Sequence, residues 1–488
     1  MTPVLLLAPV MLPLSAALGY ALVGWRPRST AWLGVLTTAL LALDAVALAV
    51  TVTRHGPLWT PGGLLRADAL SAWMLLGVAT VALLACWASP GYLAAAPGSR
   101  RRTRWYGILL QLFVAAMATA VLAGNFGVLW VAIEATTIVT AFLVGHHRDR
   151  AALEAAWKYV VICSAAIAIA FLGLVLLYDA GRHAGLSTVD ALDWTALTRY
   201  ADHLDPAVTR IAVGLAVIGF GAKAGLIPLH AWLPDAHSQA PAPVSALMSG
   251  VLLPVAVYAV LRVKVIADPA LGTGYLRTLL AVMALATLAL AALLLIAQRD
   301  YKRMLAYSSM EHMGLIALAA AIGTPLAVVA LLLHMAGHGL AKTVAFLSSG
   351  HILHHHGSTR TTDIRGLAGR TPLLAGLFGL AVLALLGFPP ASLFASELGI
   401  ARAGTAAGLG WVTAAGFALA LVAFAALIVH SGRMLLGPAP HPAERPVAFP
   451  IGTALPLIAG LVAVAALGVT LGPVTGLLQA AAAAAGAP

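Results

Sequence analysis

The stretch GFGAKAGLIPLHAWLPDAHSQAPAPVSALMSGV, residues 219–251, is the most informative part of the chain. It places Lys223 inside an apolar run of membrane-spanning character, and four prolines follow it: Pro228, Pro234, Pro241 and Pro243. An ammonium group in hydrocarbon costs several kcal/mol unless it faces a partner or water. Prolines remove backbone donors, which membrane proteins tolerate only where protein or a wet cavity satisfies the freed groups. A charge beside a broken helix at membrane depth predicts an ion pathway.

The composition indicates a chain that lies in a lipid bilayer. Of its 488 residues, 61% are hydrophobic and 9% are charged, whereas a soluble globular protein carries about 25% charged residues. We therefore predict an all-α polytopic membrane protein. The net charge is +11, but the basic residues are scattered between apolar runs, which favours membrane topology over nucleic-acid binding as their cause.

Apolar runs of spanning length predict about fourteen transmembrane helices. The first run lacks a basic leading region and is long enough to span, so we interpret it as a helix and not as a signal peptide. The predicted spans are 2–24, 30–53, 68–88, 105–123, 125–145, 155–178, 208–228, 243–263, 276–297, 303–322, 324–348, 372–403, 410–436 and 449–472.

Two of these helices are interrupted, the seventh near 228–234 and the twelfth near 387–390. Paired interruptions in corresponding places are typical of inverted-repeat transporters. We therefore expect two inverted five-helix repeats with broken helices 7 and 12. The predicted units are N-terminal helices 1–3 (1–104), a first repeat of helices 4–8 (105–265), a second repeat of helices 9–13 (266–436), and helix 14 with the tail (437–488).

The odd-numbered connections carry about twice as many arginines and lysines as the even-numbered ones. The even-numbered set includes Arg66, Arg262 and Lys264. Because positive flanks stay in the cytoplasm, we expect odd connections inside and both termini outside. The location expected for the chain is a bacterial-type cytoplasmic (inner) membrane.

Four ionisable side chains fall well inside predicted helices: Glu134, Lys223, Lys342 and Glu397. His334 and His338 precede Lys342 at intervals of four, so the three share one helical stripe. Each charge would be costly against lipid and is expected to face the protein interior. Lysine and histidine change protonation readily on burial, and with carboxylates, histidines and water they can pass protons across a membrane.

Structural interpretations of the same residues stay open. Glu134 and Lys223 could be a buried ion pair that only holds helices together, and Lys342 could snorkel to the interface. His334 and His338 could each be a hydrogen-bonded core histidine. Glu397 could cap the second half of its broken helix.

Sequence signals for cofactors are absent. The chain has no nucleotide loop, dinucleotide fingerprint, haem motif or iron–sulfur cysteine pattern, so we predict no cofactor and no redox centre. A histidine cluster at 351–356 lacks acidic or cysteine companions, and we expect no metal there. Glu311 and His312 offer no catalytic spacing but could extend the polar axis.

Several stretches together resemble the antiporter-like subunits of respiratory complex I and its relatives, the proton-conducting membrane transporter family. WLPDAH with its flanking prolines is the most specific of them. Within the family the chain looks most similar to the hydrogenase-4 component F type. The matching stretches are LRADALSAW (65–73), GNFGVLWVAIEATTI (124–138), EAAWKYVVICSA (154–165), 219–251, DYKRMLAYSSMEHMGLI (300–316), HGLAKTVAFLSSG (338–350) and GFPPASLFASE (387–397).

The resemblance implies roles for the matching positions. Glu134 and Lys223 would pair in one half-channel, His338 and Lys342 would form the centre of the second half, and Glu397 would be the exit residue. Family members often carry a lysine in helix 8 where this chain has Pro254. The central relay would then run through water, through the later histidines, or through one of two histidines in the stretch 219–251, His230 and His237.

The resemblance implies a proton-translocating membrane subunit of a hydrogenase-4-like or complex I-like respiratory assembly. Its expected partners are other membrane subunits and a hydrophilic redox arm, hydrogenase-like or quinone-reductase-like. The chain would then be a non-redox subunit of an oxidoreductase complex without a catalytic centre of its own. The alternatives are a subunit of a multisubunit sodium/proton antiporter and a structural membrane anchor.

Overall fold

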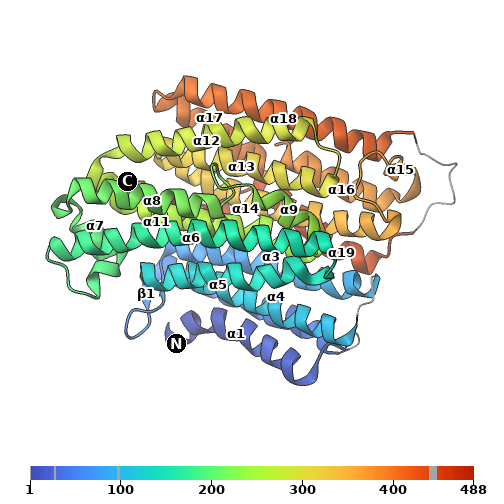
Figure 1. The fold of residues 1–488 in the computed structure, drawn as a ribbon, viewed down its shortest axis with the longest axis horizontal. Helices are drawn as coiled ribbons and strands as arrows, with labels where there is room; N and C mark the ends of the chain where they lie inside the picture. The colour runs from blue at the N-terminus through green and yellow to red at the C-terminus, as the bar shows by residue number, and fades with distance from the viewer. Residues whose placement is uncertain (1, 27–28, 96–98, 439–447, 488) are drawn as a thin grey trace.

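The computed structural model describes residues 2–26, 29–95, 99–438 and 448–487. Over these residues the chain folds into a helical bundle whose helices run side by side along its long axis (Figure 1). The uninterrupted long helices are α1 (Thr2–Val23), α2 (Leu33–His55), α3 (Ala69–Ala95), α4 (Arg100–Val121), α5 (Phe126–Val144), α6 (Arg150–His183), α12 (Thr273–Ile296), α13 (Tyr301–Ile322), α14 (Pro325–His356), α18 (Gly410–Leu436) and α19 (Ile451–Val469).

The remaining elements are interrupted or short. A five-residue π-helix, η5, joins two helices into one continuous span, and a two-stranded antiparallel sheet lies between α2 and α3. These elements are β1 (Leu58–Trp59), β2 (Arg66–Ala67), α7 (Trp194–Arg199), α8 (Pro206–Lys223), α9 (Trp232–Gln239), α10 (Ala242–Leu247), η5 (Met248–Leu252), α11 (Leu253–Leu271), α15 (Leu367–Arg370), α16 (Pro372–Leu385), α17 (Ser392–Ala406) and α20 (Thr475–Ala484).

The prediction of about fourteen spans is confirmed. Thirteen helices of the described residues are long and apolar enough to cross a membrane, and the broken pair α16–α17 gives the fourteenth. The chain is thus an integral membrane protein of all-α class. The spans of α13 and of α10–α11 are wholly buried and α14 is nearly so, whereas α1, α18 and α19 lie at the periphery.

Connections alternate between the two ends of the bundle. The β1 strand and α7 lie at the end where both chain termini are marked, and α15 lies at the opposite end (Figure 1). Both termini therefore lie on one side, as an even number of spans requires. Arg28 and Arg445, which belong to the odd-connection cations, lie outside the described residues.

The two interruptions have the same backbone geometry. Each begins with a glycine of positive φ, Gly225 at +82° and Gly387 at +65°. In both, the residue after the glycine donates its backbone N–H to the carbonyl five residues earlier, at 2.9 and 3.1 Å. This is the hydrogen-bond pattern of a Schellman helix end. The shared pattern is what a duplicated unit would leave behind.

Small residues bring the elements of the polar centre close together. A Cβ atom on Gly219 of α8 would lie 2.4 Å from the Ala166 carbonyl of α6. A Cβ atom on Gly339 of α14 would lie 2.6 Å from the Gly250 carbonyl in η5. Only glycine permits such backbone approach, so these positions fix how near α6 lies to α8 and α14 to η5.

Candidate functional site: a buried polar axis

Lys223 is the last residue of α8 and lies at the first interruption. Its side chain is fully buried, and Nζ donates hydrogen bonds to Thr137 Oγ1 and Tyr159 OH, both at 2.8 Å. The ammonium group also lies 4.8 Å from the centroid of the Tyr159 ring and 5.9 Å from that of Trp232, within cation–π range. Among the described residues no carboxylate oxygen lies within 4.0 Å of Nζ. The lysine is therefore held by neutral groups.

Glu134 lies on α5, one turn before Thr137. Ser164 Oγ donates to Glu134 Oε1 at 3.0 Å, and the other carboxylate oxygen is buried without a hydrogen-bond partner. Glu134 and Lys223 therefore belong to one site but form no ion pair in this structure. In place of the expected direct pair, Glu134 and Thr137 lie one turn apart on α5, and Thr137 accepts the hydrogen bond from Lys223.

An open groove between α4, α5 and α6 reaches this site. Its volume is about 940 Å³, and its lining is mostly apolar. Three cations, Arg101, Arg102 and Arg148, lie along the groove near the helix ends, while Thr137 and Ser164 line it farther along α5 and α6. The groove thus leads to the two hydroxyl groups that contact Lys223 and Glu134.

The second half of the molecule holds a row of histidines. His312 Nδ1 lies 3.1 Å from His334 Nε2, and His334 Nδ1 lies 2.9 Å from Ser396 Oγ. The ring centroid of His338 lies 5.1 Å from that of His312. All three histidines are fully buried. Helices α13, α14 and α17 therefore bring together a hydrogen-bonded chain of His312, His334 and Ser396. His338 lies against the His312 ring, and neither of its own ring nitrogens has a hydrogen-bond partner.

Lys342 continues the α14 stripe toward the first half. Its side chain is fully buried, and Nζ donates to the Leu305 carbonyl at 2.8 Å and to Ser308 Oγ. The snorkelling interpretation is wrong, because the ammonium group lies inside the protein. Like Lys223, Lys342 has no carboxylate oxygen within 4.0 Å in the described part of the chain.

Two carboxylates flank the histidine row. Glu311 Oε2 lies 3.6 Å from His312 Nε2. Glu397 lies against the backbone of the second interruption, where a Cβ atom on Gly387 would be 2.4 Å from Oε2. Glu397 is the sixth residue of α17, and the start of that helix has no side-chain cap, so the capping interpretation is wrong. Oε1 of both glutamates lacks a hydrogen-bond partner.

His237 lies between the two halves. It is fully buried, and neither ring nitrogen has a hydrogen-bond partner. Its ring stacks on Phe346 with centroids 5.1 Å apart, and its centroid lies 6.5 Å from that of Trp232. Trp232 contacts Lys223, and Phe346 follows Lys342 by one turn of α14. His230 lies in the interruption itself, half-buried, with an unpartnered Nδ1, and is not joined to the row.

Pro254 is accommodated by irregular backbone. It occupies the first turn of α11, directly after the π-helix η5, where the missing N–H group of proline is tolerated. A cavity of about 200 Å³ lies beside it, and Gly250, Met335 and Gly339 are among its mostly apolar lining residues. No charged side chain lies at this point of α11.

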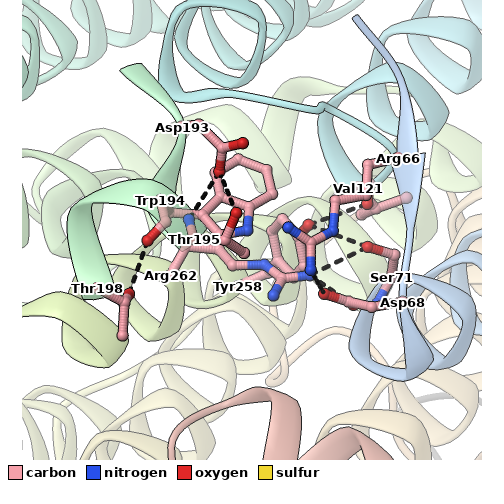
Figure 2. Close-up of polar contacts among 10 residues, drawn as sticks. All are labelled: Arg66, Asp68, Ser71, Val121, Asp193, Trp194, Thr195, Thr198, Tyr258 and Arg262. Carbon is pink, nitrogen blue, oxygen red and sulfur yellow. Dashed lines mark hydrogen bonds and ion pairs between the residues drawn. The ribbon is translucent and has the colours of Figure 1, made fainter. Parts of the chain in front are cut away.

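A second buried charge cluster lies at the end of the bundle near β1. Arg262 of α11 donates to Asp68 Oδ1 at 2.6 Å and to Ser71 Oγ at 3.1 Å (Figure 2). Arg66 lies 3.7 Å from the same carboxylate, and the Arg262 guanidinium lies over the rings of Trp194 and Tyr258, at 5.0 and 4.8 Å.

Burial corrects the interpretation of three cations that the sequence places in connections. Arg66 and Arg262 are buried in this cluster, and Lys264 is buried in α11 and paired with Asp268. None of the three is a free flanking charge. The even-numbered connections therefore carry less free positive charge than the sequence count gave them.

Sequence reasoning missed several contributing side chains. Tyr159, Ser164, Ser308 and Ser396 supply the direct hydrogen bonds of the axis, and His312 is its centre. A charge in an apolar run is conspicuous, whereas a hydroxyl in such a run is common and carries no sign of which face it occupies. The Glu311–His312 pair was the one visible signal, because two ionisable residues adjoin inside an apolar helix.

Comparisons with known proteins agree with this arrangement. Residues 123–423 match the family described as NADH:quinone oxidoreductase/Mrp antiporter, TM. The hydrogenase-4 component F homolog of Methylacidiphilum infernorum is 41% identical over 297 residues, 60% of this chain and 62% of that relative. The F(420)H(2) dehydrogenase subunit N of Methanosarcina mazei is 31% identical over 456 residues, 88% of this chain and 89% of that relative.

The fold is also similar to solved structures. A chain of the membrane-bound sulfane sulfur reductase, an archaeal respiratory membrane complex, superposes with a TM-score of 0.87 at 26% identity. The superposition covers 99% of this chain and 97% of the other.

Proposed function

The chain belongs to the NADH:quinone oxidoreductase/Mrp antiporter transmembrane family, and from this premise we propose that it is a proton-translocating membrane subunit of a hydrogenase-4-like or complex I-like respiratory assembly. Other membrane subunits and a hydrophilic redox arm would be its partners, and the arm would supply the redox chemistry. The matched part spans 62% of the length of the hydrogenase-4 relative. The relatives' names support the assembly, and the buried axis supports the proton transfer.

One observation carries the proposal: two fully buried lysines, Lys223 and Lys342, contact only neutral hydrogen-bond acceptors. A buried lysine without a fixed counter-charge changes its protonation when charge arrives or leaves nearby. The unpartnered carboxylate oxygen of Glu134 is such a nearby charge. A purely structural site would instead have its charges neutralised in place.

In the proposed path, Glu134 and Lys223 act as a charge switch and His338 and Lys342 act as the relay. His237 would connect the halves with the help of water, His334 would extend the relay, and Glu397 would release the proton. His230 would supply water access at the first interruption. The hydrogen bond between His312 and His334 supports such transfer, because an imidazole can accept a proton at one nitrogen and donate from the other.

The two-repeat organisation belongs to the same proposal. The repeats would comprise 105–265 and 266–436, between the flanking units 1–104 and 437–488, and the matched interruptions support this division. Helix α4 begins at Arg100 and α11 ends at Leu271, so two of these boundaries fall inside helices. We place the chain in a bacterial-type cytoplasmic membrane with both termini outside.

The test is proton uptake by inverted membrane vesicles that contain the assembled complex, energised by its own electron donor. Lys223→Met should abolish uptake, because Met keeps the volume and removes the ionisable group. Lys158→Met is the matched control, since Lys158 is half-exposed on α6 and contacts Glu154 and Asp235. Equal uptake in both variants would overturn the proposal.

A sodium arm of the same assay separates the alternatives. Uptake that requires a sodium gradient and no electron donor would indicate a multisubunit sodium/proton antiporter; the family description also names an antiporter, Mrp. Unchanged uptake in every variant of the axis would indicate a structural membrane anchor.

A further inference from the structure

The histidine row of the second half has the donor set of a metal site. One nitrogen from each of His312 and His334 and one carboxylate oxygen from Glu397 all lie within 4.8 Å of one another. Both histidines are fully buried, and Glu397 Oε1 is buried without a hydrogen-bond partner. Two imidazoles and a carboxylate with a fourth position left for water is a zinc ligand set.

The distance between the facing nitrogens fits a shared ion. His312 Nδ1 and His334 Nε2 are 3.1 Å apart. A tetrahedral Zn²⁺ with Zn–N bonds of 2.0–2.1 Å separates its two nitrogen ligands by about 3.3 Å. The histidines would therefore need to move apart by only a few tenths of an ångström. Glu397 would need a larger side-chain shift, and its unpartnered Oε1 leaves it free to make one.

The outer nitrogens of both rings face groups that would orient them. His334 Nδ1 lies 2.9 Å from Ser396 Oγ, and His312 Nε2 lies 3.6 Å from Glu311 Oε2. A proton on His334 Nδ1 would be donated to Ser396 Oγ, and a proton on His312 Nε2 would face the Glu311 carboxylate, which lies just beyond hydrogen-bond distance. Both facing nitrogens would then be bare. Zn²⁺ could then bind through a change of tautomer, without net loss of a proton from either imidazole. Histidine ligands of metals are commonly oriented by such partners.

The second interruption is the less buried side of the site. Glu397 is only partly buried, and Phe388, in the chain segment between α16 and α17, is 50% exposed. Glu397 is thus the most exposed of the three ligands.

We propose that His312, His334 and Glu397 form a site for a tetrahedral divalent transition-metal ion, Zn²⁺ above all, and that the bound ion blocks proton transfer along the row. The binding stands on geometry alone, whereas the block rests on the proposed function. The ion would occupy the two nitrogens between which a proton would otherwise pass.

The test uses Co²⁺ as a spectroscopic probe and Zn²⁺ as its competitor, on the full chain purified without a polyhistidine tag. The background variant carries His354→Gln, His355→Gln and His356→Gln, which removes the more exposed histidines at the end of α14. In this background we expect one Co²⁺ with the intense visible absorption of tetrahedral coordination, displaced by one Zn²⁺. Absence of that absorption would overturn the proposal.

Variants locate the ion. His312→Gln and His334→Gln should abolish the absorption, while Ser396→Ala and Glu311→Gln should weaken Zn²⁺ binding by about 10- to 100-fold. Absorption that survives His334→Gln would overturn the assignment. If the histidine variants do not fold, Glu397→Gln replaces them, since its partly exposed side chain tolerates change, and unchanged affinity there would equally overturn it.

Zn²⁺ added to the vesicle assay separates the two proposals. Inhibition of proton uptake at the concentrations that displace Co²⁺ is the expected result. Binding without inhibition would keep the metal site and show that no proton passes between His312 and His334, which removes His334 from the proposed path. No binding, with uptake still dependent on Lys223, would remove the metal site and keep the proposed function.

Discussion

Lys223 and Arg262 are both cations buried in the membrane protein's interior, yet their surroundings differ in kind. Arg262 donates at 2.6 Å to a carboxylate, Asp68, and a second cation and two aromatic rings complete its cluster. Lys223 contacts two hydroxyl groups and aromatic rings and has no carboxylate oxygen within 4.0 Å among the described residues. The first charge is neutralised in place, and the second is not.

These surroundings determine which buried cation can change its protonation. A carboxylate at hydrogen-bond distance stabilises the charged form of both partners, so neither changes its protonation easily. Hydroxyl groups stabilise an ammonium more weakly and also accept or donate when it is neutral. The Arg262 cluster therefore fastens α3 to α11 and to the connection that carries Trp194, whereas the lysines suit a proton path.

Breaking the paired cluster should have the largest effect on folding. Asp68→Asn leaves Arg262 buried without a counter-charge, and such a loss costs about 3–5 kcal/mol. The free energy of unfolding in mixed micelles measures it. Asp68→Leu combined with Arg262→Met should recover most of the loss, because the pair then becomes apolar.

An exposed carboxylate at the same end of the bundle is the control. Asp202→Asn should change the free energy of unfolding by no more than about 0.5 kcal/mol. If Asp202→Asn lowered the free energy of unfolding as much as Asp68→Asn, the Arg262 cluster would not be what stabilises this end of the bundle.

Removing an unpaired lysine should act on transport and spare folding. Lys342→Met should lower proton uptake by about 10²-fold, the contribution of one positioned proton-transfer group, with the free energy of unfolding unchanged or raised. Lys264→Met is the matched control, because Lys264 is buried but paired with Asp268. Lys264→Met should lower the free energy of unfolding and leave proton uptake unchanged. Lost uptake in Lys264→Met with lost stability in Lys342→Met would contradict the distinction between paired and unpaired lysines.

Removing one neutral contact of Lys223 should have a smaller effect. Thr137→Val keeps the side-chain shape and deletes one acceptor, which is worth about 1 kcal/mol, so proton uptake should fall by roughly fivefold. Thr136→Val is the control, because Thr136 is equally buried on α5 but bonds only to the Ile133 carbonyl. Equal losses in the two variants would show that the lysine contact is not what matters.

The smallest effect concerns pH and the Asp68 cluster. Burial raises the pKa of Asp68, but Arg262, its hydrogen bonds and Arg66 outweigh burial and hold the pKa below its ordinary value. A lowered folded-state pKa gives stability that is present above the unfolded value of about 3.9 and lost below it. The unfolding difference between wild type and Asp68→Asn should therefore stay constant from about pH 5 to 8 and shrink only in acid. A difference that varies between pH 5 and 8 would contradict this.

Much of the fold could be predicted from the sequence. Spanning runs, the two interruptions and the stripe of His334, His338 and Lys342 follow from hydropathy, proline chemistry and helical periodicity, which are local properties. The buried charges were visible because a charge in an apolar run is exceptional. The ion pair between Asp68 and Arg262 could not be predicted, because the two residues lie far apart in the chain. The sequence around Arg66 and Arg262 also gave no indication that these two cations are buried.

Hydropathy and spacing along the chain are enough to predict a helical membrane protein with ionisable groups at membrane depth and two matched interruptions. Which of those groups touch depends on how the helices pack. The packing separated Glu134 from Lys223, seated each lysine among neutral acceptors, and put His312 beside His334. The spacing of residues along the chain determines which face of a single helix each side chain occupies. A hydrogen bond between two helices depends instead on how closely small residues such as Gly219 and Gly339 let the two backbones approach.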